Sequence, residues 1–445
     1  MALLISASLG ACKKLTEDLY TDPNNPQDGT AELALPGASL AIALVQEGEL
    51  ARLTGMWSGY FQGADRQYSS LDAYIVTAGD SDSPWDYLYT GAFTQADIVL
   101  QKANELNNPG IAAIAKIHKA YAAGSAAALW GDVPFSEANK IEQTRSPKYD
   151  AQVDVYKGAI ALLDDAVKDI DSGKGGLVDI SRDIFFNGDL LLWKKVAISL
   201  KARYYLHLKN YDKAYENAKL GISKSSEELI MPHGNEYGNK NIYFYFLYDE
   251  RSGYLMGSSY FFDMMTKRQN VKTDESTRIA YYFYDSDPTE PNYGDGIFAE
   301  DADYVLLGAA ENTLIWAETS LRKPSPSFDE ALAALNMHRE AMGFDAYDPA
   351  DFNAGGLENK DGITANDALL REILEEKYVS LYGSIEGYND LRRTWKDAVR
   401  VKVPVKSATM TSIPLRLLYP QSEINTNPNI PNPLPGLFEA TPVNK

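Results

Sequence analysis

The sequence predicts a mostly α-helical protein: a single domain in which paired helices carry long irregular loops. Three observations lead to this prediction. Several long segments repeat apolar residues every three or four positions, which is the spacing of one helix face. Two of these segments follow one another almost directly, as the two arms of a helical hairpin do. Clusters of Pro, Gly and Asn interrupt the remaining chain, and these residues favour turns and loops.

The first segment of the chain has the features of an export leader. Apolar residues dominate residues 3–9, and the small residues Gly10 and Ala11 precede Cys12, the only cysteine of the 445 residues. An apolar run followed by small residues is typical of a signal peptide and its cleavage site. A cysteine directly after such a site resembles a lipobox, in which the thiol is acylated. We therefore predict a leader over residues 1–11 and lipidation of Cys12.

Residues 12–29 are predicted to be a flexible tether between the lipid and the domain. They contain two prolines and two asparagines within residues 22–26, a composition that cannot hold a helix. Each buried CH₂ of an acyl chain contributes about 0.8 kcal/mol, so a multiply acylated cysteine is a stable anchor. No Lys or Arg precedes the apolar run, and we expect that the sequence begins within the leader. The domain is predicted to cover residues 30–445.

Helical spacing continues through most of the domain, from about Leu35 onward. The predicted helices lie at 109–131, 153–170, 190–208, 211–222, 302–320, 327–342 and 364–382. Where 190–208 is followed by 211–222, small residues such as Ala202 allow two helices to approach closely. This pair resembles a tetratricopeptide-type hairpin, so the domain is predicted to consist of tetratricopeptide-like helix pairs.

Four stretches lack helical spacing. Residues 57–89 are rich in aromatic residues and are interrupted by Gly and Pro, which predicts loops. Residues 232–251 contain a Tyr/Phe run that fits either a strand or a packed loop. Residues 285–303 form an irregular acidic insertion, and loops of this length inside a domain tend to be functional. Residues 414–445 are rich in Pro and Asn and are expected to lie over the surface.

Charge and hydropathy exclude several classes of partner. The chain has 62 acidic and 42 basic residues, a net charge of -20, and no basic cluster. Nucleic acid is therefore not an expected partner, and neither is anionic lipid bound through basic residues. After the first eleven residues, no apolar stretch approaches the ~18 residues of a membrane-spanning helix. Contact with a membrane is expected only through the lipid on Cys12.

No constellation of catalytic or metal-binding residues is found. The sequence contains no G-x-S-x-G, P-loop or H-E-x-x-H motif, and its four histidines lack the spacing of metal ligands. We therefore predict that the protein is not an enzyme and has neither a cofactor nor a metal site. The acidic residues of 285–303 fit a solvated loop better than a calcium cage, although such oxygen ligands do bind calcium.

The aromatic stretch 57–89 is the predicted ligand site. A sugar ring has an apolar face of C–H bonds that stacks on aromatic side chains, and hydroxyls that bind carboxylates and amides. Loops on a rigid scaffold are a usual place for such contacts. The alternative is that these rings hold the loops against the core. The predicted ligand-binding residues are Trp57, Tyr60, Gln62, Asp65, Arg66, Tyr68 and Trp85.

Several motifs in a fixed order give the chain a resemblance to one family. They are the Cys12 leader, residues 19–26, Trp130-Gly131-Asp132-Val133-Pro134-Phe135, residues 373–378, residues 387–394, and residues 416–423 with 427–429. Together they resemble the SusD/RagB-like family of outer-membrane nutrient-binding lipoproteins, particularly its second SusD-like subgroup. Each motif alone is weak, but the ordered set spans nearly the whole chain.

The resemblance implies a function. Members of the family are lipid-anchored on the extracellular side of the outer membrane and capture a nutrient, most often an oligosaccharide. They deliver it, acting as a lid, to a SusC-like TonB-dependent transporter. Capture of a peptide by the same machinery is one alternative, and a helical-repeat scaffold that binds only protein is another. A third, an α/α-barrel glycosidase, is disfavoured because no catalytic constellation is found.

Two arginines of the 387–394 motif are expected to be structural. Arg392 and Arg393 lie near Asp390 and Glu386 in the sequence. We expect ion pairs among these residues that join helix ends, because buried arginines usually orient a scaffold.

Overall fold

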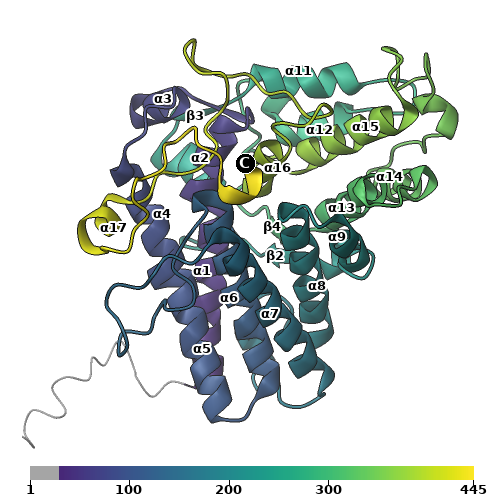
Figure 1. Ribbon diagram of the computed structural model, residues 1–445. Helices are drawn as coiled ribbons and strands as arrows, with labels where there is room; N and C mark the ends of the chain where they lie inside the picture. Colours follow the sequence, from purple (N-terminus) through teal and green to yellow (C-terminus); the bar gives the residue numbers. More distant parts are fainter. Residues whose placement is uncertain (1–29) are drawn as a thin grey trace, which may run out of the picture.

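The computed structural model describes residues 30–445, so the predicted leader, Cys12 and the tether lie outside the described residues. The protein is mostly α-helical, as predicted (Figure 1). The helices are α1 (Ala31–Glu47), α2 (Glu49–Trp57), α3 (Arg66–Asp72), α4 (Asp82–Asp86), α5 (Thr94–Glu105), α6 (Pro109–Trp130), α7 (Gln152–Asp171), α8 (Leu190–His207), α9 (Tyr211–Ala218), α10 (Ile242–Phe244), α11 (Ser259–Arg268), α12 (Ser276–Tyr282), α13 (Ala309–Arg322), α14 (Phe328–Ala341), α15 (Ala365–Ser380), α16 (Ile385–Arg393) and α17 (Gln421–Thr426).

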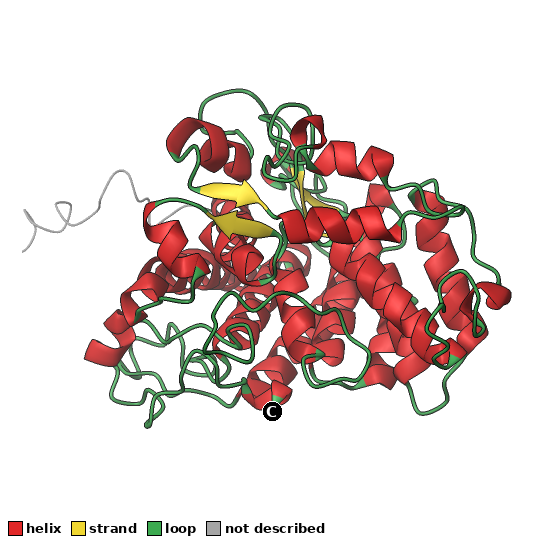
Figure 2. Cartoon of the chain, turned by 90° about the horizontal axis from the view of Figure 1, so that it is seen from above, coloured by secondary structure: helices red, strands yellow, loops and turns green. Residues whose placement is uncertain are grey.

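Four short strands form two antiparallel pairs. Strand β1 (Phe61–Gly63) pairs with β3 (Leu255–Gly257), and β2 (Leu229–Met231) pairs with β4 (Tyr304–Leu307). Figure 2 shows how little strand there is beside the helices. In each pair the two strands are far apart in sequence, so these small sheets join distant parts of the chain.

Paired helices form the framework. In Figure 1, α1, α5, α6, α7 and α8 run side by side, and the hairpins α8–α9 and α13–α14 follow next to them. One close approach shows why small residues are needed: a Cβ on Gly124 of α6 would lie 2.2 Å from the Tyr204 ring of α8. The Tyr204 hydroxyl donates to Ala120 O at 2.9 Å, which fixes the crossing. The predicted hairpin at 190–208 and 211–222 is confirmed as α8 and α9.

The tryptophan motif after α6 closes this framework. Gly131 caps the helix with a positive φ of 87°, a conformation that glycine adopts without strain. The indole N–H of Trp130 donates to Leu418 O at 2.8 Å, across 288 residues of sequence. Phe135 packs where Gly158 of α7 has no side chain. The motif therefore joins α6, α7 and the C-terminal segment.

Three predicted segments differ in the structure. Residues 57–89 contain short helices, not only loops, because polar side chains cap them: Asp65 accepts from the first N–H of α3. Residues 232–251 contain α10 followed by a π-helical turn instead of a strand or loop. The segment 302–320 begins as β4 and becomes helical only at Ala309. Residues 414–445 are largely without regular structure, apart from α17 and a short 3₁₀ turn.

The arginines of α16 are buried, but only one of them forms ion pairs. Arg393 pairs with Asp390 at 2.8 Å, as expected. Arg392 instead donates to the carbonyl oxygens of Ala128 and Leu415, at 2.9 and 3.1 Å. The expectation of an ion pair was wrong for Arg392, because its guanidinium caps the end of α6.

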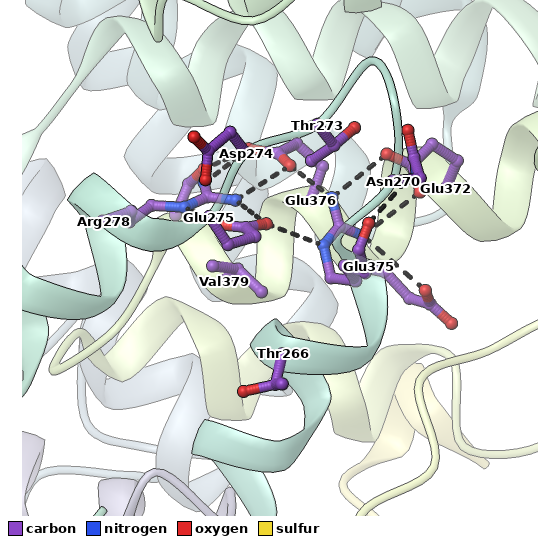
Figure 3. Close-up of polar contacts among 12 residues, drawn as sticks. Thr266, Asn270, Thr273, Asp274, Glu275, Arg278, Glu372, Glu375, Glu376 and Val379 are labelled. Atoms are coloured by element: carbon purple, nitrogen blue, oxygen red, sulfur yellow. Dashed lines mark hydrogen bonds and ion pairs between the residues drawn. The ribbon is translucent and has the colours of Figure 1, made fainter. Parts of the chain in front are cut away.

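A buried ion-pair cluster joins α11, α12 and α15 (Figure 3). Glu376 of α15 lies 2.7 Å from Arg278 Nη1 and 2.5 Å from Arg268 Nη2. Arg268 also forms an ion pair with Glu372 at 3.1 Å, and Arg278 pairs with Glu275 at 2.6 Å. All five side chains are nearly inaccessible to solvent. This cluster fixes the position of α12, which borders the largest cavity found.

Candidate functional site

The structure divides the seven predicted ligand residues between the core, one surface and one cavity. Trp57 and Tyr60, at and just after the end of α2, are fully buried. The indole N–H of Trp57 donates to Leu71 O at 2.9 Å, and the Tyr60 hydroxyl donates to Tyr378 O at 2.6 Å. Tyr60 also stacks on the ring of Tyr378, with centroids 4.6 Å apart. Tyr60 thus joins the end of α2 to α15, Trp57 packs edge-on against Tyr388 of α16, and neither ring has a free face for a ligand.

Three polar residues of the predicted set lie at the surface, where β1 leads into α3. Gln62 points outward between two buried neighbours, and the side chains of Asp65 and Arg66 are 61% and 73% exposed. Tyr68 is buried, and its ring packs against Phe246 with centroids 4.9 Å apart. The polar side chains are accessible to a ligand, whereas Tyr68 supports the segment that follows α10.

That segment, the π-helical turn η5 (Tyr245–Glu250), places tyrosines on the surface. Asn241 begins α10 just before it by accepting hydrogen bonds from two backbone N–H groups. Phe246 faces inward, while Tyr245 and Tyr248 are 36% and 59% exposed. π-Helical turns are rare and occur frequently at functional sites.

The loop after α12 brings two further tyrosines beside Tyr248. The ring centroids of Tyr248 and Tyr293 are 5.7 Å apart, and those of Tyr293 and Tyr284 are 6.4 Å apart with planes only 7° from parallel. Gly294 permits this arrangement, because a Cβ there would lie 2.7 Å from the Tyr284 ring. We call the following four residues the tyrosine surface: Tyr245, Tyr248, Tyr284 and Tyr293.

Carboxylates border the tyrosine surface. Glu250 accepts a hydrogen bond from the Tyr245 hydroxyl at 3.0 Å, and this bond raises the pKa of Tyr245 to about 12. Asp287 accepts from the N–H and the hydroxyl of Thr289, which lowers the Asp287 pKa below its ordinary value. The surface combines apolar rings with charged acceptors, so it suits a ligand that has both apolar faces and hydroxyl groups.

The exposed polar residues near α3 adjoin the tyrosine surface. Tyr254 lies between Arg66 and Arg251, whose guanidinium carbons are 5.8 and 5.9 Å from its ring centre. Arg251 directly follows η5. Arg66 therefore lies near the end of the turn that carries Tyr248.

Trp85 lies elsewhere, in the wall of a cavity beside α4. Its ring is 6% exposed and lies 4.4 Å from the ring of Tyr89, measured between centroids. The cavity has a volume of about 580 Å³. Its polar lining comprises Asp82, Ser83, Asp86, Thr90, Asn139, Ser422 and Glu423. Aromatic walls and polar side chains also suit a sugar, so Trp85 remains a predicted ligand contact at this second place.

The exposed tyrosines were not among the predicted site residues, although two signals pointed to them. The run Tyr243-Phe244-Tyr245-Phe246 was interpreted only as a strand or packed loop, and 285–303 was recognised as a functional insertion. The sequence does not reveal that these two segments lie side by side, because only the fold brings Tyr248 and Tyr293 together.

Within residues 30–445, no group of three or more His, Cys, Asp or Glu side chains could hold a metal ion, and this includes 285–303. None of the helices in this part of the chain combines the length and apolar composition needed to span a membrane.

Comparisons with solved structures place the fold. A SusD/RagB family protein from Bacteroides thetaiotaomicron superposes with a TM-score of 0.69 at 19% identity, over 90% of this chain and 95% of that one. A SusD homologue from Bacteroides fragilis gives 0.68 at 20% identity, over 94% and 99%. A chitin-binding SusD homologue from Flavobacterium johnsoniae gives 0.66 at 17% identity, over 89% and 93%.

The sequence comparisons agree with the structural ones. No curated protein matches the sequence significantly. Residues 38–420, however, match the model of the second SusD-like family, which is described as starch-binding and associating with the outer membrane. Because this match covers most of the chain, the protein belongs to the SusD-like family.

Proposed function

We propose that the protein captures an oligosaccharide on the tyrosine surface and delivers it to a SusC-like TonB-dependent transporter. The observation that carries this proposal is the row of neighbouring rings of Tyr248, Tyr293 and Tyr284, bordered by carboxylates. Tyr248 and Tyr284 are exposed, and Tyr293 between them is partly buried. Such a row suits a chain of sugar rings, each with an apolar face. The family description as starch-binding, and the chitin-binding relative, support a glycan ligand.

In this proposal the protein binds and releases its ligand without breaking a bond. Tyr248 and Tyr293 stack on sugar faces, while Asp287 and Glu290 accept hydrogen bonds from hydroxyl groups. Arg66 and Asp65 contact the part of the ligand that extends toward α3. Tyrosine suits this role because it presents a large ring with little conformational entropy to lose.

Anchoring and delivery complete the proposal. Acylated Cys12 would hold the protein on the extracellular side of the outer membrane, and residues 12–29 would serve as the tether that lets the domain act as a lid over the transporter. The family association with the outer membrane supports this location. Metabolic labelling with a fatty acid tests the anchor: label is expected in the wild type and absent in Cys12→Ser.

A glycan array followed by titration tests the capture step. The form lacking residues 1–12 is expected to bind at least one oligosaccharide saturably and to release no reducing ends. Tyr248→Ala and Tyr293→Ala are each expected to weaken binding about tenfold, which corresponds to ~1.4 kcal/mol. Tyr87→Ala is the matched control, because Tyr87 is 52% exposed and, within residues 30–445, makes no ring contact with the tyrosine surface. Equal losses in all three variants would contradict the site.

The same array separates the alternatives. Peptide capture by the same machinery predicts binding of extended peptides, with affinity that depends little on Tyr248. A helical-repeat scaffold predicts no binding of either ligand class by the isolated protein. Release of sugar in proportion to protein concentration would indicate a hydrolase instead.

A further inference from the structure

A large cavity between α12 and α13 shares no lining residue with the tyrosine surface. Its volume is about 720 Å³, within the range of cavities that hold small organic ligands. Its walls come from α12 and the segment before it, β4 and the start of α13, and the turns after α14 and α15. We call it the α12–α13 cavity. The proposed capture of glycan makes no use of it.

Aliphatic side chains line this cavity and remain exposed. Val271 is 86% exposed, Val305 is 45% exposed and Met342 is 39% exposed, and all three border the same space. Tyr281, also on the wall, is 47% exposed. Together these side chains give the cavity an apolar wall that is open to solvent.

Acidic side chains give the cavity a negative potential. Asp274, Asp303 and Asp345 line it, and none of the three forms an ion pair with a basic side chain of residues 30–445. Glu228 is the fourth acidic residue in the lining. Within residues 30–445, its carboxylate accepts one hydrogen bond, from the N–H of Ala309 at 2.7 Å.

The basic residues of the cavity are already neutralised. Lys272 Nζ lies 3.0 Å from Asp348 and 2.7 Å from Asp351. Arg278 is held by Glu275 and Glu376, the contacts drawn in Figure 3. The cavity therefore presents Asp274 and Asp345 without a basic side chain of residues 30–445 to balance them, whereas Asp303 accepts the backbone N–H of His233 at 3.0 Å and helps to raise the pKa of that imidazole.

We propose that the α12–α13 cavity binds an aliphatic polyamine. Its ammonium groups would pair with the carboxylates of Asp274, Asp303 and Asp345, and its methylene spacers would lie along Val305 and Met342. A sugar fits these walls poorly, because hydroxyl groups would lose water against aliphatic side chains without a partner. A bare metal ion fits poorly too, since it leaves the apolar walls exposed. Alternating charge and methylene matches both features of the cavity.

Titration of the whole protein with spermidine tests this proposal. We expect saturable binding that 1,8-octanediol, a chain of similar length without charge, does not reproduce. In a competition experiment with labelled spermidine, Mg²⁺ at an equal concentration of positive charge is expected to displace little of the bound label. If Mg²⁺ displaced the label as completely as unlabelled spermidine does, the proposal would be overturned, because the protein's overall negative charge would then account for the binding.

Variants locate the site. The combined change Asp274→Asn, Asp303→Asn and Asp345→Asn is expected to weaken spermidine binding at least tenfold. The combined change Glu105→Gln, Glu142→Gln and Asp212→Asn is the control for net charge, because it also removes three negative charges and all three residues are exposed and outside the cavity lining. Val305→Thr keeps the shape of the side chain on β4 but makes the cavity wall polar. We expect the affinity for spermidine to fall several-fold in this variant. Unchanged glycan binding on the tyrosine surface confirms that each variant is folded. Equal affinity of the triple variant and the wild type would refute the site.

Discussion

Glu318 of α13 and Arg393 of α16 form a buried bidentate ion pair. Each terminal nitrogen of the guanidinium donates to one carboxylate oxygen, both at 2.8 Å, and both side chains are inaccessible to solvent. Arg393 also pairs with Asp390. The pair joins the α13–α14 hairpin to the SusD-family motif at 387–394, so the second arginine of that motif is a packing residue.

Replacing this arginine by lysine is expected to destabilise the fold. Arg393→Lys keeps the charge but cannot make two parallel hydrogen bonds, and Glu318 loses a partner in the core. We expect a loss of roughly 2–4 kcal/mol in the free energy of unfolding, measured by urea denaturation. Arg400→Lys is the control, because the side chain of Arg400 is only half-buried and has no acidic partner within residues 30–445. Similar losses in both variants would contradict this account.

The Glu376 cluster predicts a stability that falls in acid. Burial alone would raise the pKa of Glu376, but the charges of Arg278 and Arg268 outweigh it and hold the pKa well below the usual value. The stability that this carboxylate contributes is therefore complete above about pH 4.5 and is lost as the pH falls through the lower folded-state pKa. The difference in unfolding free energy between the wild type and Glu376→Gln should be roughly 3–5 kcal/mol at pH 7. This difference in unfolding free energy should become smaller as the pH is lowered toward 2.

Glu375→Gln is the neighbouring control for this measurement. The Glu375 side chain is 31% exposed, and its contact with Arg268 is long, at 3.6 Å. Its replacement should change stability by less than 1 kcal/mol, in line with a partly solvated ion pair. A pH-independent effect of Glu376→Gln would show that the cluster does not titrate as described.

His233 and Glu47 predict the opposite pH dependence. Burial lowers the pKa of His233, but the hydrogen bond to Glu47 at 2.9 Å and its charge outweigh burial, so the pKa is raised above 6.5. The stability from this pair is present below about pH 6.5 and is lost as the pH rises through the raised value. His233→Gln should therefore destabilise the protein more at pH 6 than at pH 9.

Proton NMR titration of the histidines checks the assignment. His233 should titrate above 6.5, whereas His118 is the internal control. Burial against apolar neighbours lowers the pKa of His118 to about 3, so it should stay neutral from pH 5 to pH 9. A His233 signal that titrates below 6.5 would rule out the proposed dependence.

The contact between Gly124 and Tyr204 predicts a steric effect. Gly124→Ala places a methyl group where the Tyr204 ring lies, so α6 and α8 must separate. Thermal unfolding should show a loss of roughly 1–3 kcal/mol. Gly37→Ala in α1 is the control: its nearest neighbour would be 3.8 Å from the new Cβ, and alanine should stabilise the helix by about 0.5–1 kcal/mol. Loss of stability in both would show that the helical position, not the ring, is responsible.

The sequence predicted the helix pairs well because their signal is local. Helical spacing found α8, α9, α14 and α15 to within a few residues, and the motif ending in Gly131 marked the end of α6. The ligand residues were harder to predict, because exposure depends on distant partners. Trp57 and Tyr60 are aromatic residues of a Gly-rich stretch, but Tyr378 buries one of them from 318 residues away. The neighbouring rings of Tyr248 and Tyr293 belong to a π-helical turn and a loop that no periodic pattern marks.

The hydrogen bonds of Tyr60 and Tyr378 have a consequence for how the chain folds. Tyr60 donates to Tyr378 O, and Tyr378 donates back to Ser58 O across 320 residues. Trp130 and Arg392 make contacts almost as distant in sequence. The core thus stays incomplete until the last quarter of the chain has been synthesised, and contacts of such long range make folding slow. A newly synthesised chain therefore lacks a complete core until its C-terminal residues can pack against residues 58–60.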